Sequence, residues 1–472
     1  MDLRLNLISL VGVYCLCVVA WLTSENKREI PWNVIKWGLG MQFLLGFLIF
    51  VVPVTRDRVA DLNNLLNALM DASEAGARFL FGSIIVPDPK VKLTPLVDSV
   101  TGDIDLTSLI NPQTNLIDMK RISLGFIFAF RALPMVIFFS AVVSLAYRMN
   151  IIQPVVKVFA KIFQATMKLS GAESLSGAAN IFVGIESAIA VKPFLEKMTR
   201  SELAAILTSC FGSIASTVLG LYAGLLKSTF PNITGHLMSA SLMTIPACFV
   251  ISKIIIPETS TPLTMGGIPE EPETNEKKPS YMDALILGAM DGVKMAVGIA
   301  AVIIAILGVV ALVNSVFFFL ANQVNSEFVV IQFVGKFFQV VSIDNIFGVL
   351  FFPLTFVTGV SLDLGEVWQA SILIGQRVLQ TSIPPYLALS KLSQSGMITD
   401  RTMIIVSYVL CGFAHIPSIG IFVGGLSGLV PSRSHEISSI AWKSLWAATL
   451  ATLMTGCIAG IFDFGLPSVL GK

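Results

Sequence analysis

Long uncharged runs of apolar residues recur along the whole chain. Each run could cross the hydrocarbon core of a bilayer as a helix, which takes about 20 residues. Two further apolar stretches, 171–198 and 343–392, are interrupted by Gly, Pro and polar residues, as re-entrant hairpins are. The pattern predicts an all-α polytopic membrane protein with about eight transmembrane helices and two re-entrant helical hairpins. The expected helices cover residues 5–22, 37–54, 122–147, 203–226, 237–254, 292–320, 403–430 and 444–462.

The polar segments between these runs divide the chain. Residues 55–80 place leucines at helical spacing with charges between them, which predicts an amphipathic helix lying in the membrane interface. A stretch rich in Asp and Pro predicts an exterior excursion, and one rich in Pro, Glu and Thr predicts a flexible cytoplasmic linker. We expect two N-terminal helices with the interfacial helix (1–85), the excursion (86–121), a first half with the first hairpin (122–256), the linker (257–281) and a second half with the second hairpin (282–472).

The two halves repeat one arrangement. In each, a hairpin is followed by a helix with a Ser-Ile pair among small residues, Ser213-Ile214 in the first half and Ser418-Ile419 in the second. Paired apolar segments interrupted by Gly or Pro, in corresponding positions of two halves, indicate a transporter binding site. Gly- and Ser-rich stretches also serve plain helix packing, which is the alternative.

Composition supports a membrane protein and excludes several other classes. The 472 residues are 54% hydrophobic and only 13% charged, a balance that soluble globular domains do not have. A net charge of +1 gives no basis for a nucleic-acid partner. The six cysteines lie inside apolar runs and the three histidines lack metal-site spacing, so we expect neither a zinc site nor a metal-centred enzyme.

The distribution of Lys and Arg predicts the orientation. Basic residues gather in the loops after the first, third and fifth expected helices and before the last. These loops share one side if the N-terminus is outside, which places both termini and residues 86–121 outside the cell. The N-terminal run resembles a signal-peptide core but lacks a basic start and a cleavage site, so we interpret it as a retained transmembrane helix.

The most informative segment is 177–198. It is apolar, yet it contains Asn180, Glu186 and Ser187 next to Gly184. An ionisable residue at membrane depth costs about 2.5–3.5 kcal/mol and is therefore a functional-site hypothesis. The segment indicates a broken helix around a small polar ligand; the alternative is a loop with a glutamate near the membrane surface.

Three segments resemble the concentrative nucleoside transporters: GFIFAFRALPMVIFFSAVVSLAY (125–147), the run 177–203, and CGFAHIPSIGIFVGGLSGLVP (411–431). The resemblance extends over nearly the whole chain apart from residues 86–121. It implies eight core helices, two opposed hairpins, a homotrimer and coupling to sodium or protons. It also implies a sodium site, with the side chains of Asn180 and Ser213 and the carbonyls of Val183 and Ile214 as ligands. The alternative is that Asn180 caps a helix and Ser213 only packs.

The expected substrate site departs from the family pattern. The first hairpin tip reads Gly184-Ile185-Glu186, where the family has an additional amide residue before the glutamate. In the second hairpin, Thr381-Ser382 stands where the family has Asn and a ribose-binding Glu. On the following helix, His415 replaces an Asn, and it would be either a neutral donor and acceptor or a cation. The expected substrate-binding residues are Glu186, Ile185, Val218, Thr381, Ser382, Phe413, His415 and Ser418.

These features predict a sodium-coupled symporter in the bacterial inner membrane that imports a nucleoside or nucleoside-like solute by alternating access. No cofactor is expected besides the coupling ion. The partners expected are the solute, sodium, the lipid bilayer and two further copies of the chain. A non-nucleoside and possibly anionic solute, or proton coupling, remain alternatives. A channel or an enzyme is disfavoured because no filter-like ring and no catalytic motif is evident.

Overall fold

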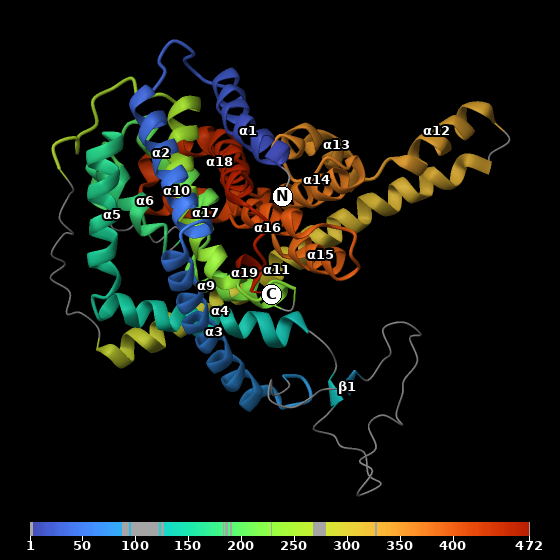
Figure 1. The fold of residues 1–472 in the computed structure, drawn as a ribbon, viewed down its shortest axis with the longest axis horizontal. Helices are drawn as coiled ribbons and strands as arrows, with labels where there is room; N and C mark the ends of the chain where they lie inside the picture. Colours follow the sequence, from blue (N-terminus) through green and yellow to red (C-terminus); the bar gives the residue numbers. More distant parts are fainter. Residues whose placement is uncertain are drawn as a thin grey trace, which may run out of the picture.

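The computed structural model describes residues 3–86, 94–95, 122–123, 127–182, 184, 187–188, 191–227, 229–267, 280–325 and 328–471. Helices dominate this part of the chain (Figure 1). The only strands there are β1 (Thr94–Pro95) and β2 (Ile122–Ser123), a short parallel pair. The predicted all-α class is confirmed. Most of the predicted excursion, residues 87–93 and 96–121, lies outside the described residues.

The N-terminal helices precede the first half. They are α1 (Leu3–Leu22), α2 (Trp32–Phe50) and α3 (Pro53–Phe81). The first half comprises α4 (Phe128–Arg148), α5 (Ile152–Met167), α6 (Gly171–Ala179), α7 (Lys192–Leu195), α8 (Arg200–Gly212), α9 (Ser216–Leu226) and α10 (Ile233–Ile255). We call α6, α7 and the residues between them hairpin 1.

The second half comprises α11 (Tyr281–Ala321), the 3-10 turn η4 (Asn322–Asn325), α12 (Val329–Val340), α13 (Ile343–Phe356), α14 (Leu364–Leu379), α15 (Ile383–Gln394), α16 (Asp400–Leu410), α17 (Ile416–Leu429), η5 (Pro431–Arg433) and α18 (Ser434–Phe462). A short C-terminal helix, α19 (Pro467–Leu470), follows. We call α14, α15 and the residues between them hairpin 2.

Six helices in the described part are long and apolar enough to cross a membrane on their own: α1, α2, α4, α10, α11 and α18. The expected spans 203–226 and 403–430 are instead broken, into α8 and α9 and into α16 and α17. The count of eight single helices is therefore not confirmed. Ser213 adopts an extended conformation at the first break (φ −92°, ψ 166°), and His415 does so at the second (φ −141°, ψ 154°).

Helices α10 and α18 form the buried centre of the molecule, packed against α1, α2, α8 and α16. At the crossing of α10 and α18, the hydroxyls of Thr244 and Thr455 lie 3.1 Å apart. Small residues along both helices let neighbouring backbones approach closely, which is the usual basis of helix packing in membranes. The two broken helices pack against this centre, and the hairpins pack against the broken helices.

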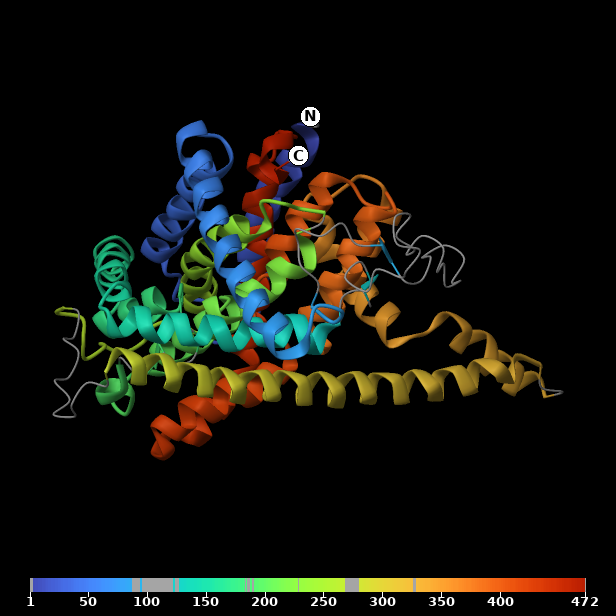
Figure 2. The same ribbon diagram turned by 90° about the horizontal axis from the view of Figure 1, so that it is seen from below.

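Helices α4 and α11 form a separate pair beside this centre (Figure 2). Gly288 and Gly292 face α4, and a Cβ on Gly292 would lie 2.7 Å from the Cα of Ile137. The far part of α11 and α12 extend away from the body of the molecule (Figure 2), with many exposed apolar side chains. Helix α11 of this pair forms one wall of the site described below.

The segment predicted as a flexible linker begins as ordered structure. Residues 257–267 are described, and Thr264 accepts from the backbone N–H of Gly171 with its carbonyl (2.9 Å) and from that of Ala172 with its hydroxyl (3.1 Å). The backbone N–H groups at the start of α6 thus donate hydrogen bonds to the segment that follows α10. Residues 268–279 lie outside the described residues.

Candidate substrate and ion site

The two helix breaks lie directly against each other. A Cβ on Gly412, which follows α16, would be 2.4 Å from the carbonyl oxygen of Gly212, which ends α8. Any side chain at Gly412 would therefore push the breaks apart. The close approach brings the residues after both breaks into one small region between the hairpins.

A cavity of about 410 Å³ opens beside the breaks. This volume is within the range of small-molecule sites, about 300–1,000 Å³. Five of the predicted substrate residues line it together: Val218, Thr381, Phe413, His415 and Ser418. Gly184, next to the predicted hairpin 1 motif, also lines the cavity, whereas Ile185 and Glu186 lie outside the described residues.

His415 caps the N-terminus of α17. Its Nδ1 accepts a hydrogen bond from the backbone N–H of Ser418, at 3.2 Å. An imidazole nitrogen that accepts carries no proton, so this geometry fits a neutral histidine with its proton on Nε2. A neutral His415 offers one acceptor to the helix and one donor to the cavity, as an asparagine amide would. The geometry favours the neutral alternative over the cation.

The hydroxyl of Ser418 is already used within the protein. Its Oγ donates to the carbonyl oxygens of Phe413 and His415, each at 2.6 Å. Ser382 behaves similarly, because its Oγ donates to the carbonyl of Gly412 at 3.1 Å. Ser382 is fully buried and does not line the cavity, so the structure does not bring it together with the other predicted substrate residues.

The predicted ion ligands lie at the ends of α6 and α8. Asn180 is the C-terminal cap of α6, is fully buried, and approaches Cys210 of α8 with its Nδ2 at 3.5 Å from Sγ. Ser213 is buried too, and its Oγ contacts no hydrogen-bond partner in the described structure. A buried hydroxyl without a partner is costly, and a bound cation would satisfy its oxygen. Ile214 is buried in the same turn, and Val183 lies outside the described residues.

Sequence reasoning missed the wall formed by α11. Lys294, Met295, Gly298, Ile299 and Val302 all line the cavity. Lys294 pairs with Asp291 at 3.0 Å, and a charged pair within an apolar span was the available signal. The sequence analysis also missed Tyr222, which lines the cavity and whose ring lies 4.9 Å from that of Tyr386.

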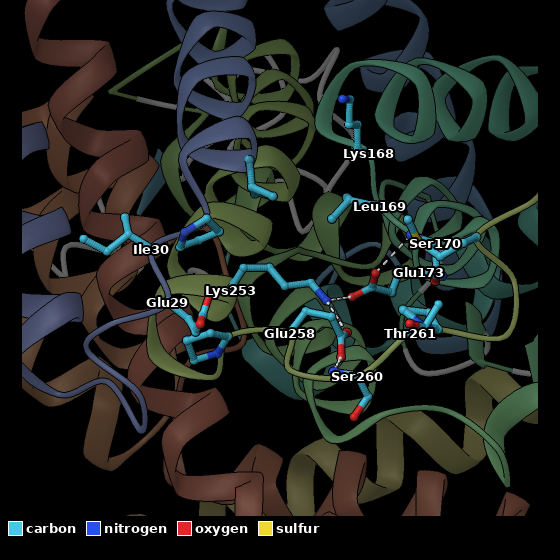
Figure 3. A pocket seen from close by; sticks show the side chains of 15 residues that line it. Glu29, Ile30, Lys168, Leu169, Ser170, Glu173, Lys253, Glu258, Ser260 and Thr261 are labelled. Atoms are coloured by element: carbon cyan, nitrogen blue, oxygen red, sulfur yellow. Dashed lines mark hydrogen bonds and ion pairs between the residues drawn. The ribbon is translucent and has the colours of Figure 1, made fainter.

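A second cavity, of about 290 Å³, lies at the root of hairpin 1 (Figure 3). There the ammonium of Lys253 lies 2.5 Å from Glu173 and 3.3 Å from Glu258. Glu202 joins the network through the hydroxyl of Ser170, which donates to its carboxylate at 2.6 Å. Lys253, Glu173 and Glu202 are nearly inaccessible to solvent, so these contacts fix the start of α6 to α8 and α10. The sequence analysis did not single out these residues.

Known proteins match the chain from end to end. Residues 11–84 match the family described as "Na+ dependent nucleoside transporter N-terminus", residues 129–229 match "Nucleoside recognition", and residues 236–460 match "Na+ dependent nucleoside transporter C-terminus". The "Putative nucleoside permease NupX" of Escherichia coli is 31% identical over 96% of this chain and 98% of its own length.

A longer relative and a solved structure also match nearly the whole chain. "Solute carrier family 28 member 3" of Homo sapiens is 31% identical over 97% of this chain, which spans only 60% of that protein. The solved structure of CNTnw in an inward-facing substrate-bound state superposes with a TM-score of 0.81 at 28% identity, covering 99% of this chain and 100% of that one. The relatives and the fold are those of transporters, and the apolar helices make this a multi-pass membrane protein. The chain belongs to the Na+-dependent nucleoside transporter family.

Proposed function

We propose that the protein is a sodium-coupled symporter that imports a nucleoside or nucleoside-like solute by alternating access. The observation that carries this proposal is the cavity of about 410 Å³ at the two helix breaks, adjoining the break that contains the unpartnered hydroxyl of Ser213. Solute and ion sites at the breaks of discontinuous helices are typical of secondary transporters. The solute would lie against Phe413 and Val218 and receive a hydrogen bond from His415.

Sodium would bind where α6 and α8 end. The ligands would be the amide oxygen of Asn180, the hydroxyl of Ser213 and the carbonyls of Val183 and Ile214. Oxygen ligands and helix C-terminal ends suit a small monovalent cation. Sodium would join the end of α6, within hairpin 1, to the break after α8, so that the ion favours the form of the protein that holds the solute.

A second candidate is the same carrier with an anionic solute. Lys294 is the one charged side chain among the described residues that line the cavity, and its ammonium group would attract an anion. Its ion pair with Asp291 offsets that attraction, because the two charges nearly cancel at a distance. We therefore place the uncharged nucleoside first.

Assembly and orientation complete the proposal. The protein would act as a homotrimer in the bacterial inner membrane, with both termini outside. Exposed apolar side chains on α11 and α12, including Ile304, Phe319 and Phe333, support burial of this surface by lipid or by further copies of the chain.

Uptake by proteoliposomes tests the function. Radiolabelled uridine and adenosine are supplied with an inward sodium gradient, a proton gradient or neither, and unlabelled nucleosides and nucleotides serve as competitors. We expect saturable, sodium-driven uptake of adenosine, and weak uptake of and weak competition by uridine, because Ser382 stands where the family resemblance implies a ribose-binding carboxylate. Uptake that ignores sodium but stops when the proton gradient is removed would contradict sodium coupling. Better competition by nucleotides than by nucleosides would favour the anionic solute.

A further inference from the structure

In each half, the first helix of the hairpin ends near the break of the helix that follows the hairpin. Equivalent positions are 200 residues apart in the sequence. Helix α6 ends at Ala179 and α14 at Leu379, and Thr199 and Thr399 are the N-terminal caps of α8 and α16. By this correspondence Gln380 caps α14 as Asn180 caps α6. The ends of the two hairpin helices can therefore be compared residue by residue.

In the second half, a protein cation occupies this junction. Arg377 lies in the last turn of α14 and is completely buried. Its Nη1 donates to the carbonyl of Val409 near the end of α16 at 2.6 Å, and to the hydroxyl of Thr452 in α18 at 2.8 Å. Within the described part of the chain no carboxylate forms an ion pair with it, and its Nε and Nη2 have no acceptor.

The charge of Arg377 is instead balanced by helix ends. A helix C-terminus carries partial negative charge on its last carbonyls, which favours a cation there. Both α14 and α16 end beside the guanidinium. Hairpin 2 also supplies donors to two other carbonyls near this break: the hydroxyl of Tyr386 to Ser407 at 2.8 Å, and Ser382 to Gly412 at 3.1 Å.

In the first half, no described residue takes the place of Arg377. Gly177 stands at the position equivalent to Arg377, and the ring of Phe249 fills the space beside it, since a Cβ there would lie only 2.3 Å from the ring. No Lys or Arg side chain of the described residues donates to the last turns of α6 and α8. The negative ends of these helices and the hydroxyl of Ser213 thus receive no Lys or Arg side chain from the part of the chain that the structure describes.

We propose that Arg377 is a resident cation, whose guanidinium takes in the second half the place that sodium takes in the first, so that the protein binds one sodium ion per transport cycle. The proposal rests on the sodium coupling proposed above. It follows that sodium binding and release control hairpin 1, whereas hairpin 2 stays joined to α16 by Arg377, Tyr386 and Ser382 throughout the cycle.

The test removes the resident charge and counts sodium ions. The purified full-length protein is unfolded at increasing sodium, with choline holding the ionic strength constant. Above the Kd of the site, each tenfold increase in sodium adds about 1.4 kcal/mol of stability per ion bound. We expect a one-ion slope for the wild type and for Arg377→Lys. We expect about twice that slope for Arg377→Ala, because the carbonyl of Val409 and the hydroxyl of Thr452 are then available to a second ion.

Thr452→Val is the matched control, since it removes one hydrogen bond of Arg377 and keeps the charge. It should lower the melting temperature while leaving the one-ion slope. A one-ion slope in Arg377→Ala, with only a lower melting temperature, would show that Arg377 is merely structural and overturn the proposal. Sodium-insensitive stability in every variant would instead reject the proposed coupling. Should Arg377→Ala fail to fold, the reversal potential of wild-type transport decides: one sodium per solute supports the proposal and two overturn it.

Discussion

His415 stands where the family pattern has an asparagine, and its neutral imidazole can offer the same hydrogen bonds as an asparagine amide. Its Nδ1 caps α17 through Ser418, which leaves the Nε2 proton for a ligand. We predict that His415→Asn retains binding, while His415→Ala weakens it about 10-fold or more, because a desolvated hydrogen bond is worth about 1–3 kcal/mol. Isothermal titration with the best-bound solute measures both. Since the imidazole is neutral, affinity should stay constant between about pH 6 and pH 8; affinity that rises on acidification would indicate a cationic His415 instead.

Asn180 and Ser213 carry the sodium prediction at the same scale. Asn180→Ala removes a proposed oxygen ligand, and Ser213→Ala removes the buried hydroxyl that has no partner in the described structure. Each should raise the sodium concentration for half-maximal uptake about 10-fold, with little change at saturating sodium. The matched control is Ser209→Ala, because the hydroxyl of Ser209 is already bonded to Ala205 within α8. If Ser213→Ala behaves like this control, Ser213 is not a ligand.

At the scale of the element, the ion pair of Lys253 and Glu173 fixes the start of hairpin 1 to α10. Lys253→Met leaves Glu173 buried without its cation, which should destabilise the protein by about 3–5 kcal/mol. Adding Glu173→Gln removes the uncompensated charge and should recover much of that loss, so the two substitutions should be strongly non-additive. Thermal unfolding of both single variants and the double variant measures the coupling. Additive losses would mean that the ion pair does not hold the hairpin.

Glu25 links elements at the surface. Its carboxylate lies 2.8 Å from both Arg200 of α8 and Lys443 of α18. Hydrogen bonds from these two cations lower the pKa of Glu25 from 4.5 to about 2. A lowered pKa stabilises the fold above the unfolded value, and this contribution is lost as pH falls from 4.5 toward 2. Screening by solvent limits it to about 1 kcal/mol. Glu25→Gln should lose this pH dependence in melting experiments, and an unchanged profile would contradict the assignment.

The long helices could be predicted from the apolar runs, whereas the breaks within 203–226 and 403–430 were not predicted. Gly212 and Ser213 interrupt one run, and His415 and Pro417 interrupt the other, so the sequence carries a signal at both sites. Contacts between distant segments could not be predicted in this way. Ser382 lies behind the cavity because the carbonyl of Gly412 needs a donor, and Lys294 faces the cavity because small residues of α11 fix its packing on α4.

At the scale of the whole molecule, the positions of Lys and Arg predict both termini outside and residues 257–281 inside. The chain suits a labelling test because Cys210, Cys248, Cys411 and Cys457 are buried, which leaves Cys15 and Cys17 to be replaced by Ser. A cysteine introduced at Gly266 is in open space, where its Cβ would meet no atom within 4 Å. In intact cells a membrane-impermeant maleimide should not label Gly266→Cys, and should label it after permeabilisation.

The exterior control is Leu466, which follows α18, and Ser24, in the basic loop between α1 and α2, serves as a second site that is expected inside. Leu466 is 40% exposed, so Leu466→Cys should be accessible to the reagent. The predicted orientation requires labelling of Leu466→Cys in intact cells and protection of Gly266→Cys and Ser24→Cys. The opposite pattern would place the basic loops outside and contradict the predicted orientation.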